Sequence, residues 1–352
     1  MMEIIEWIWG IYMSKFRKIR YILILAVIFA ITGCTKAQEE VYQIPEDKKL
    51  IVYTAHKKEV YGPIIKEFEE RTGVFVEIRT GDTLALFEKI KDDEREKVDV
   101  MFGGGIENFE ECREYLEPYT VEEVDKIQPQ YRAGEDVYTP FSVLPTVFVY
   151  NNKLVYPVAA PKTWAELLTD RWKGKIAFAD PTRSGSSYTA LCTMIQAVDE
   201  DEQTALMLFA NALDGNISSD SGAVLDEVNA GTRLVGITIE GMAKQRMLEG
   251  ADLSIIYPTD GISEIPDATA IIKGAEHMDN ARLFVDFTVS RDVQRLVEEV
   301  LFRRTVRNDL QEYWTEEENR MRVIDYDVPW AVEEKENILK TWGEIQNKDK
   351  QK

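Results

Sequence analysis

The feature that most constrains the fold is an alternation of strand and helix patterns along most of the chain. The β-branched run 49–54 (KLIVYT) precedes a helical pattern over 60–72, and a second strand over 75–79 precedes a helical pattern over 83–91. A third strand, 98–102, runs into three consecutive glycines. This alternation is typical of βαβ units. We therefore expect an α/β fold whose sheets are mostly parallel and flanked by helices.

Two long extended stretches interrupt this rhythm, one at 141–151 (FSVLPTVFVYN) and one at 253–257 (LSIIY) before Pro-Thr-Asp-Gly. Each has the pattern of a chain crossing from one lobe to another, so we predict two lobes joined by a hinge. Clefts between α/β lobes, at the carboxyl ends of strands, are the usual ligand sites. The predicted segments are lobe 1 (48–145 and its return, 258–310), lobe 2 (146–257) and a C-terminal helical tail (311–352).

The N-terminal segment has the three-part layout of a secretory signal. Basic residues between Lys15 and Arg20 precede an apolar run over 21–31, which leads into Thr32-Gly33-Cys34. The run is short for a bilayer span, which needs ~20 apolar residues. The Ile-Thr-Gly-Cys end is similar to a bacterial lipobox, and Met13 is a better start than Met1 for such a signal. We predict a signal peptide (1–33), a lipidated Cys34 and a flexible tether (34–47); the alternative is an uncleaved membrane anchor.

Composition narrows the function. A net charge of -21 argues against nucleic acid, which needs basic patches to neutralise phosphates. The chain has two histidines, which excludes a histidine-rich metal site, and it lacks Gly-x-Ser-x-Gly, His-Glu-x-x-His and Walker motifs. We therefore expect neither an enzyme nor a bound cofactor. Cys112 and Cys192 are interpreted as buried free thiols, although a disulfide between them stays open.

Several loops that follow a strand or open a helix are rich in hydroxyl, glycine and acidic residues. The loop 184–189 (SGSSYT) opens a helix, where unpaired N–H groups and the positive dipole end favour a phosphate, phosphonate or carboxylate. Ser186 or Ser187 could instead merely cap that helix. Glu240 follows a strand and could bind ligand hydroxyls or be an ordinary surface acid. The other candidate loops are Thr54-Ala55-His56, Gly81-Asp82-Thr83, Gly103-Gly104-Gly105 and Ser219-Asp220.

Three segments carry a resemblance to a known family. They are VYTAHKKEVYGPIIKEFEERTGVFVE near the front, ADPTRSGSSYTAL in the middle, and PDATAIIKGAEHMDNARLFVDFTVSRDVQ near the end. Together they resemble the extracellular solute-binding lipoproteins of ABC importers, in the iron(III), phosphonate and sugar-phosphate branch with a type II periplasmic-binding-protein fold. The resemblance covers roughly residues 48–308.

The resemblance implies a monomeric receptor, held by lipid outside the cell membrane, that passes a small anionic solute to an ABC permease. The solute would be an organophosphate, such as a sugar phosphate or phosphoglycerate, or a phosphonate. The anionic head would be held by Ser184, Ser186, Ser187 and Thr189. The rest of the solute would be read by Thr54, His56, Thr83, Gly104, Ser219, Asp220 and Glu240.

Two alternatives remain. Iron-binding members of the branch have a tyrosine pair near the position of Ser218-Ser219, often with a histidine on the first loop, where this chain has His56. Serine hydroxyls are poor substitutes for phenolates toward ferric iron, a hard cation, so direct iron binding is disfavoured. The second alternative is a secreted hydrolase on the same fold.

Overall fold

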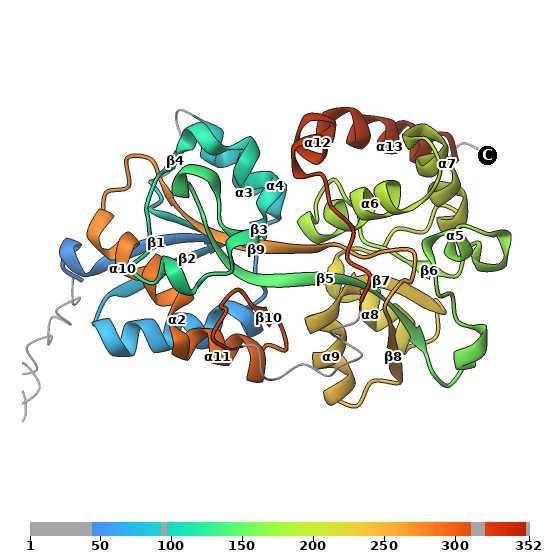
Figure 1. The fold of residues 1–352 in the computed structure, drawn as a ribbon, viewed down its shortest axis with the longest axis horizontal. Coiled ribbons are helices and arrows are strands. Elements are labelled where there is room, and N and C mark those ends of the chain that lie inside the picture. The colour runs from blue at the N-terminus through green and yellow to red at the C-terminus, as the bar shows by residue number, and fades with distance from the viewer. Residues whose placement is uncertain (1–43, 93–96, 311–320, 350–352) are drawn as a thin grey trace, which may run out of the picture. The chain divides into compact units, whose positions relative to one another are not determined.

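The structure is a computed structural model that describes residues 44–92, 97–310 and 321–349. From Pro45 onward the chain forms one compact unit (Figure 1). The strands are β1 (Lys49–Thr54), β2 (Phe75–Thr80), β3 (Val100–Gly105), β4 (Leu116–Glu117), β5 (Thr139–Asn151), β6 (Ile176–Ala177), β7 (Val235–Ile239), β8 (Leu253–Ile256), β9 (Glu264–Ile272) and β10 (Arg304–Thr305). The helices are α2 (Lys58–Thr72), α3 (Thr83–Lys91), α4 (Ile106–Glu111), α5 (Trp164–Leu167), α6 (Gly185–Ala197), α7 (Glu202–Leu213), α8 (Ser221–Asn229), α9 (Glu240–Leu248), α10 (Met278–Val289), α11 (Arg291–Glu299), α12 (Val328–Glu333) and α13 (Lys335–Asp349).

Lobe 1 is built on the parallel strands β2-β1-β3, with β9 antiparallel beside β3. Successive side chains of a strand point to opposite faces, and the core follows this alternation. Leu50 and Val52 pack in one cluster with residues of α2, α10 and α11, whereas Tyr53 packs in another with residues of α3 and α4. Figure 1 accordingly shows α2, α10 and α11 on one side of these strands and α3 and α4 on the other.

Lobe 2 has the same layered design. β6 is parallel to β7, and β7 and β8 both pair antiparallel with β5. Phe148 and Tyr150 of β5 belong to the core cluster that includes residues of α5, α6, α7 and α13. Val147 and Val149 belong to the opposite cluster, with residues of α8 and α9. Both lobes are therefore sheets covered by helices on two faces.

Strand β5 runs through both lobes. It pairs with β9 as far as Pro145 and with β7 from Thr146 onward. The chain returns after β8, where the amide of Thr146 donates to the carbonyl of Ser263 (3.2 Å) and β9 continues into lobe 1. The antiparallel crossing strands make the sheet mixed, while the strands on either side of them pair in parallel.

The C-terminal helices contact both lobes. Trp342 of α13 is buried in lobe 2 against the rings of Phe178 and Phe209. Toward lobe 1, the Tyr326 hydroxyl donates to Glu107 Oε1 (2.8 Å) and Lys335 Nζ donates to Asn108 Oδ1 (2.9 Å) on α4.

Cys112 and Cys192 are buried free thiols, which confirms that interpretation over the disulfide. Within residues 44–92, 97–310 and 321–349, no helix combines the length and the apolar character needed to span a bilayer. The predicted signal peptide and the lipidated Cys34 lie outside the described residues.

Candidate functional site

A cavity of about 470 Å³ lies between the two lobes. Lobe 1 lines it with the loops that follow β1, β2 and β3, and lobe 2 lines it with the segments that open α6 and α8. Both crossing strands contribute, through Leu144 and Thr146 of β5 and Ile265 and Asp267 of β9. The cavity thus lies at the carboxyl ends of strands, where ligands bind in open α/β sheets. The predicted residues that line it are His56, Thr83, Gly104, Ser184, Ser186, Thr189, Ser219 and Asp220.

The glycines after β3 allow a close approach of backbone to side chains. Gly103 and Gly104 have φ angles of 97° and 110°, which L side chains rarely adopt. A Cβ on Gly103 would lie 2.6 Å from Nε2 of His56, and one on Gly104 would lie 3.0 Å from the Phe87 ring. Gly103 is therefore needed for the packing of His56, while the Gly104 backbone forms part of the cavity wall.

The N-terminus of α6 forms the lobe 2 wall. Ser184 is its N-cap, because its side chain accepts a hydrogen bond from the amide of Ser187. This corrects the alternative interpretation, in which Ser186 or Ser187 would be the cap. Ser186 lines the cavity beside Ser184, and the two hydroxyl oxygens lie 3.2 Å apart. Gly185 faces lobe 1 so closely that a Cβ there would lie 3.1 Å from Thr83.

Thr189 lies one turn further along α6 and also lines the cavity. Its hydroxyl donates to Oε1 of Glu107 (2.8 Å), a fully buried carboxylate at the start of α4. The same Oε1 accepts the hydrogen bond from Tyr326. Thr189 therefore connects the cavity wall, through lobe 1, to the C-terminal segment.

The start of α8 places Ser219 and Asp220 on the cavity. Asp220 is the helix cap, since its Oδ1 accepts from the amides of Gly222 and Ala223. Asp220 is thus both the cap of α8 and a residue of the cavity lining. The hydrogen bonds from these amides and the contact with Lys57 lower the pKa of Asp220, although partial burial opposes them.

Three predicted residues lie away from the cavity lining. Thr54 is fully buried, and its hydroxyl donates to the carbonyl of Phe102 on the neighbouring strand (2.7 Å). Ser187 follows the helix turn away from the cavity, and its hydroxyl donates to Ser184 Oγ (3.1 Å). Glu240 is fully buried, and its carboxylate accepts from Arg304 Nε (2.9 Å) and Nη2 (3.2 Å).

The floor of the cavity contains charged residues that the sequence analysis did not select. Asp267 of β9 is 1% exposed and accepts hydrogen bonds from Arg303 Nη1 (2.8 Å) and from the amide and hydroxyl of Ser142. Nε2 of His56 lies 3.4 Å from the same carboxylate. Burial, and then the charge of Arg303, hold the pKa of His56 well below its ordinary value, so the imidazole is neutral. A lone acid inside the mostly apolar run 265–272 was the one sequence signal for this cluster.

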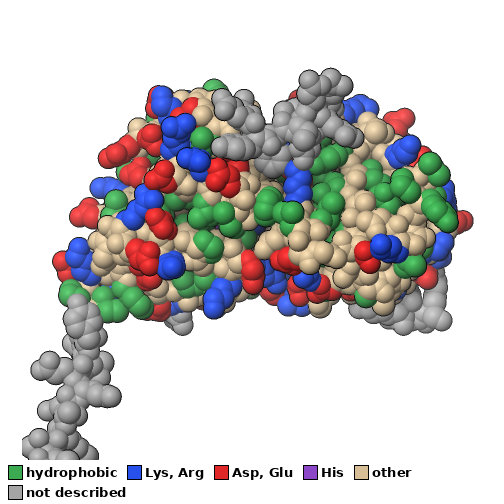
Figure 2. All heavy atoms as spheres, turned by 90° about the horizontal axis from the view of Figure 1, so that it is seen from below, with side chains coloured by type: hydrophobic (Ala, Val, Ile, Leu, Met, Phe, Trp, Pro, Cys, Tyr) green, Lys and Arg blue, Asp and Glu red, His purple; other side chains and the backbone are tan. Residues whose placement is uncertain are grey.

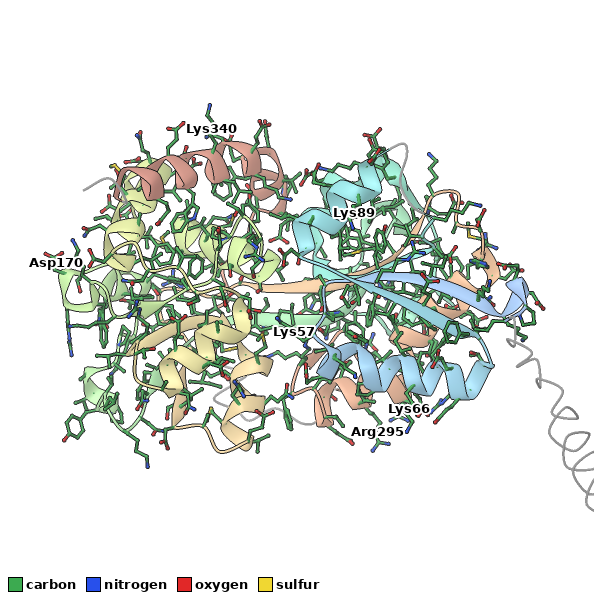
Figure 3. All side chains as sticks on the ribbon, turned by 180° about the vertical axis from the view of Figure 1, so that it is seen from behind. Lys57, Lys66, Lys89, Asp170, Arg295 and Lys340 are labelled. Atoms are coloured by element: carbon green, nitrogen blue, oxygen red, sulfur yellow. The ribbon has the colours of Figure 1, made fainter. Side chains whose placement is uncertain are left out.

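Two ion pairs join the lobes beside the cavity. Arg183 Nε of lobe 2 lies 3.0 Å from Asp82 Oδ2 of lobe 1, and Lys57 Nζ of lobe 1 lies 3.3 Å from Asp220 Oδ1 of lobe 2. Lys57 projects where the two lobes meet (Figure 3). All four side chains are about half exposed, so each pair contributes at most about 1 kcal/mol to stability. These pairs position the lobes rather than stabilise the fold.

Charge elsewhere is dispersed. On the face shown in Figure 2, acidic and basic side chains are interspersed over both lobes. Across the part of the chain that the structure describes, no three His, Cys, Asp or Glu side chains are grouped as metal ligands would be.

Comparison with known proteins places these features in a family. A protein of Haemophilus influenzae, described as uncharacterized, is 27% identical over 359 residues, spanning 93% of this chain and 97% of that protein. A putative 2-aminoethylphosphonate-binding periplasmic protein of Salmonella typhi is 25% identical over 186 residues. That match covers 50% of this chain and about half (54%) of the relative.

Solved structures give the same fold. The periplasmic binding protein AfuA of Actinobacillus pleuropneumoniae, with exogenous fructose-6-phosphate bound, matches with a TM-score of 0.77 and 22% identity, over 85% of this chain and 98% of AfuA. Iron-bound HitA of Pseudomonas aeruginosa matches with a TM-score of 0.72 and 18% identity, over 84% and 99% of the two chains. These likenesses confirm the predicted two-lobed periplasmic-binding-protein fold. The family model described as bacterial extracellular solute-binding protein matches residues 98–328, and this chain belongs to that family.

Proposed function

We propose that this protein is a monomeric receptor, tethered by lipid on Cys34 outside the cell membrane, that binds a small organophosphate or phosphonate and delivers it to an ABC permease. The observation that carries the proposal is the N-terminus of α6 in the cavity wall. The first amides of a helix have no intrahelical partner, and the helix dipole favours an anion beside them. The Ser184 cap fixes this helix start, and Ser186 adds a hydroxyl at the cavity surface.

Side chains of both lobes support an anionic head at this place. Thr83 and Gly104 of lobe 1 line the cavity, and Thr83 lies directly opposite Gly185. The cationic side chains of Lys57 and Arg183 also line the cavity. A ligand that contacts the α6 terminus and these lobe 1 residues together stabilises the closed arrangement of the lobes. Because a ligand shifts a conformational equilibrium by its differential affinity, only a bridging ligand drives closure.

The relatives agree with this ligand class. One is named for binding 2-aminoethylphosphonate, and one was solved with fructose-6-phosphate. Others are named for ferric iron, such as the Fe(3+)-binding periplasmic protein of Serratia marcescens. The experiment must therefore include both organophosphates and iron.

The test is a melting experiment on the full chain, purified in detergent, unfolded and refolded to remove carried ligand, and followed by tryptophan fluorescence. The panel contains hexose phosphates, glycerol phosphates, phosphoglycerate, aminoethylphosphonate, inorganic phosphate and ferric citrate. A ligand at ~100 times its Kd adds ~2.7 kcal/mol of stability, which is a visible rise in Tm. A rise with ferric citrate alone would overturn the proposal and redirect attention to His56.

A matched pair of serine variants then tests the position of the anion. Ser186→Ala removes the hydroxyl at the cavity surface and should weaken binding roughly tenfold or more, as expected for a hydrogen bond to a charged group. Ser187→Ala, one residue along the same helix but away from the cavity, should leave the affinity unchanged. Equal affinity of both variants and the wild type would refute the proposed role of the α6 terminus.

A further inference from the structure

The cavity floor, defined as His56, Asp267 and Arg303, is a polar surface separate from the start of α6. All three side chains line the cavity, although each is more than nine-tenths buried. Such groups are costly to bury unless they are hydrogen-bonded. The burial of these three polar side chains therefore needs an explanation, either hydrogen bonds within the protein or a ligand that binds to them.

Hydrogen bonds within the protein satisfy only part of the floor. Arg303 Nη1 donates to Asp267 Oδ2 (2.8 Å) and to Ser142 Oγ (3.2 Å), and Ser142 donates to Asp267 Oδ1 through its amide (2.9 Å) and its hydroxyl (2.7 Å). These bonds fix the Arg303–Asp267 pair. Within the described ranges, the side-chain hydrogen bonds of Arg303 all come from Nη1, so Nε and Nη2 are still available as donors.

His56 is the residue of the cavity floor whose hydrogen bonding is incomplete. Its side chain is 6% exposed, and its ring packs against Phe102 and Phe141. Nε2 makes no hydrogen bond with any of the described residues, because its 3.4 Å contact with Asp267 lacks hydrogen-bond geometry. A neutral imidazole has one N–H donor and one lone-pair acceptor. The His56 ring, which lines the cavity, therefore carries an unsatisfied polar atom.

The floor carries no net charge. The guanidinium of Arg303 is protonated at all physiological pH values, and the Asp267 carboxylate beside it compensates its charge. With His56 neutral, a second anionic group on the ligand would lose its hydration and face Asp267. An ammonium group would lose its hydration and face Arg303. In neither case does net countercharge offset the desolvation.

We propose that the cavity floor binds a hydroxyl group of the solute, while the start of α6 binds the anionic head. The hydroxyl accepts a hydrogen bond from Arg303, and it either accepts one from His56 or donates one to it. This inference rests on the proposed function and refines it. A hydroxyl suits the floor because it donates and accepts at once and carries no charge. The cargo class is then a phosphorylated or phosphonylated alcohol or polyol, in preference to an amino- or carboxy-substituted phosphonate.

The test uses ligands that share one anionic head and differ only at the other end. Plain, hydroxy-, amino- and carboxy-alkylphosphonates with chains of two, three and four carbons are titrated calorimetrically into the full chain in detergent. The chain lengths cover a range of spans between α6 and the floor. At the best length, we expect the hydroxyl compound to bind roughly tenfold or more tightly than the plain one, because a site built for a hydroxyl rejects the analogue that lacks it. The amino and carboxy compounds should bind no better than the plain one.

His56→Phe identifies the group responsible, since it keeps a ring against Phe102 and Phe141 but removes both nitrogens. The advantage of the hydroxyl compound should shrink while the affinity for the plain compound is kept. His277→Gln, which changes the other histidine outside the cavity, is the control. If His56→Phe fails to fold, the ligand series measured on the wild-type protein still tests the inference.

The outcomes separate the two levels of inference. If all the organophosphates of the melting panel and all the phosphonates fail to bind, the proposed function is wrong. If the phosphonates bind but the amino or carboxy compound is tightest, the hydroxyl inference is overturned and the proposed function stands. A hydroxyl advantage that persists fully in His56→Phe would also overturn the inference.

Discussion

Glu240 offers a sharp distinction between a ligand residue and a structural one. Its carboxylate is fully buried and pairs with Arg304, whose side chain is 11% exposed. Removing one partner of a buried ion pair costs roughly 3–5 kcal/mol. In Glu240→Gln the amide oxygen still accepts a hydrogen bond and Glu264 remains 3.2 Å from Arg304, so we expect a smaller cost than this, about 2–3 kcal/mol. At roughly 2 °C per kcal/mol for a chain of this size, Tm should fall by about 4–6 °C.

The assay measures Tm and ligand affinity on the same variant. We expect the Tm to fall while Kd for the best panel ligand stays within about twofold, because Glu240 does not line the cavity. An unchanged Tm with a tenfold weaker ligand would refute the structural interpretation and restore Glu240 to the binding site.

Other predictions concern titratable and core groups. The pKa of His56 is lowered by burial, so its contribution to stability is complete above about pH 6.5 and is lost as pH falls toward its folded pKa; His56→Phe should flatten the acid side of a Tm–pH curve. His277 behaves oppositely: burial lowers its pKa, but the hydrogen bonds and charges of Asp99 and Glu46 together outweigh burial and raise the pKa. Its contribution to stability is therefore lost as pH rises through the folded pKa, and His277→Gln should flatten that side of the curve. Burial raises the pKa of Cys112 and Cys192 to about 12, so a thiol reagent should label them only after denaturation; labelling of either of these two residues in the native protein would contradict their burial. Trp342→Ala should cost about 3–5 kcal/mol without changing ligand affinity, and a Tm within 2 °C of the wild type would count against the docking of α13.

The alternation of strands and helices predicted the fold class because it depends on local periodicity. β1 illustrates this: Leu50 and Val52 face one helix layer and Tyr53 the other, as a period of two requires. The antiparallel pairing of β5 with β9 depends on residues more than a hundred positions apart. No local pattern specifies such a pairing.

The part of the candidate site that depends on backbone geometry alone was predictable from the sequence. A serine-rich helix start exposes its amides whichever lobe it belongs to, and the segment 184–186 does line the cavity. The direction of each side chain is a finer question, because successive residues on a helix differ by about 100°. Ser186 and Ser187 therefore cannot both face the same ligand, although the sequence presents them as equivalent.

The floor lay beyond sequence reasoning for a different reason, since its members become a site only through the crossing strands. His56 follows β1, Asp267 lies in β9, and Arg303 precedes β10, and each alone has an ordinary interpretation as a loop, strand or surface residue. β9 connects lobe 1 to the return crossing, so Asp267 lies where the lobes join. A ligand group that binds there contacts the strands that join the two lobes. The anionic head at α6 and the group at the floor would therefore bridge lobe 2 and the crossing strands, which would link recognition of the whole solute to lobe closure.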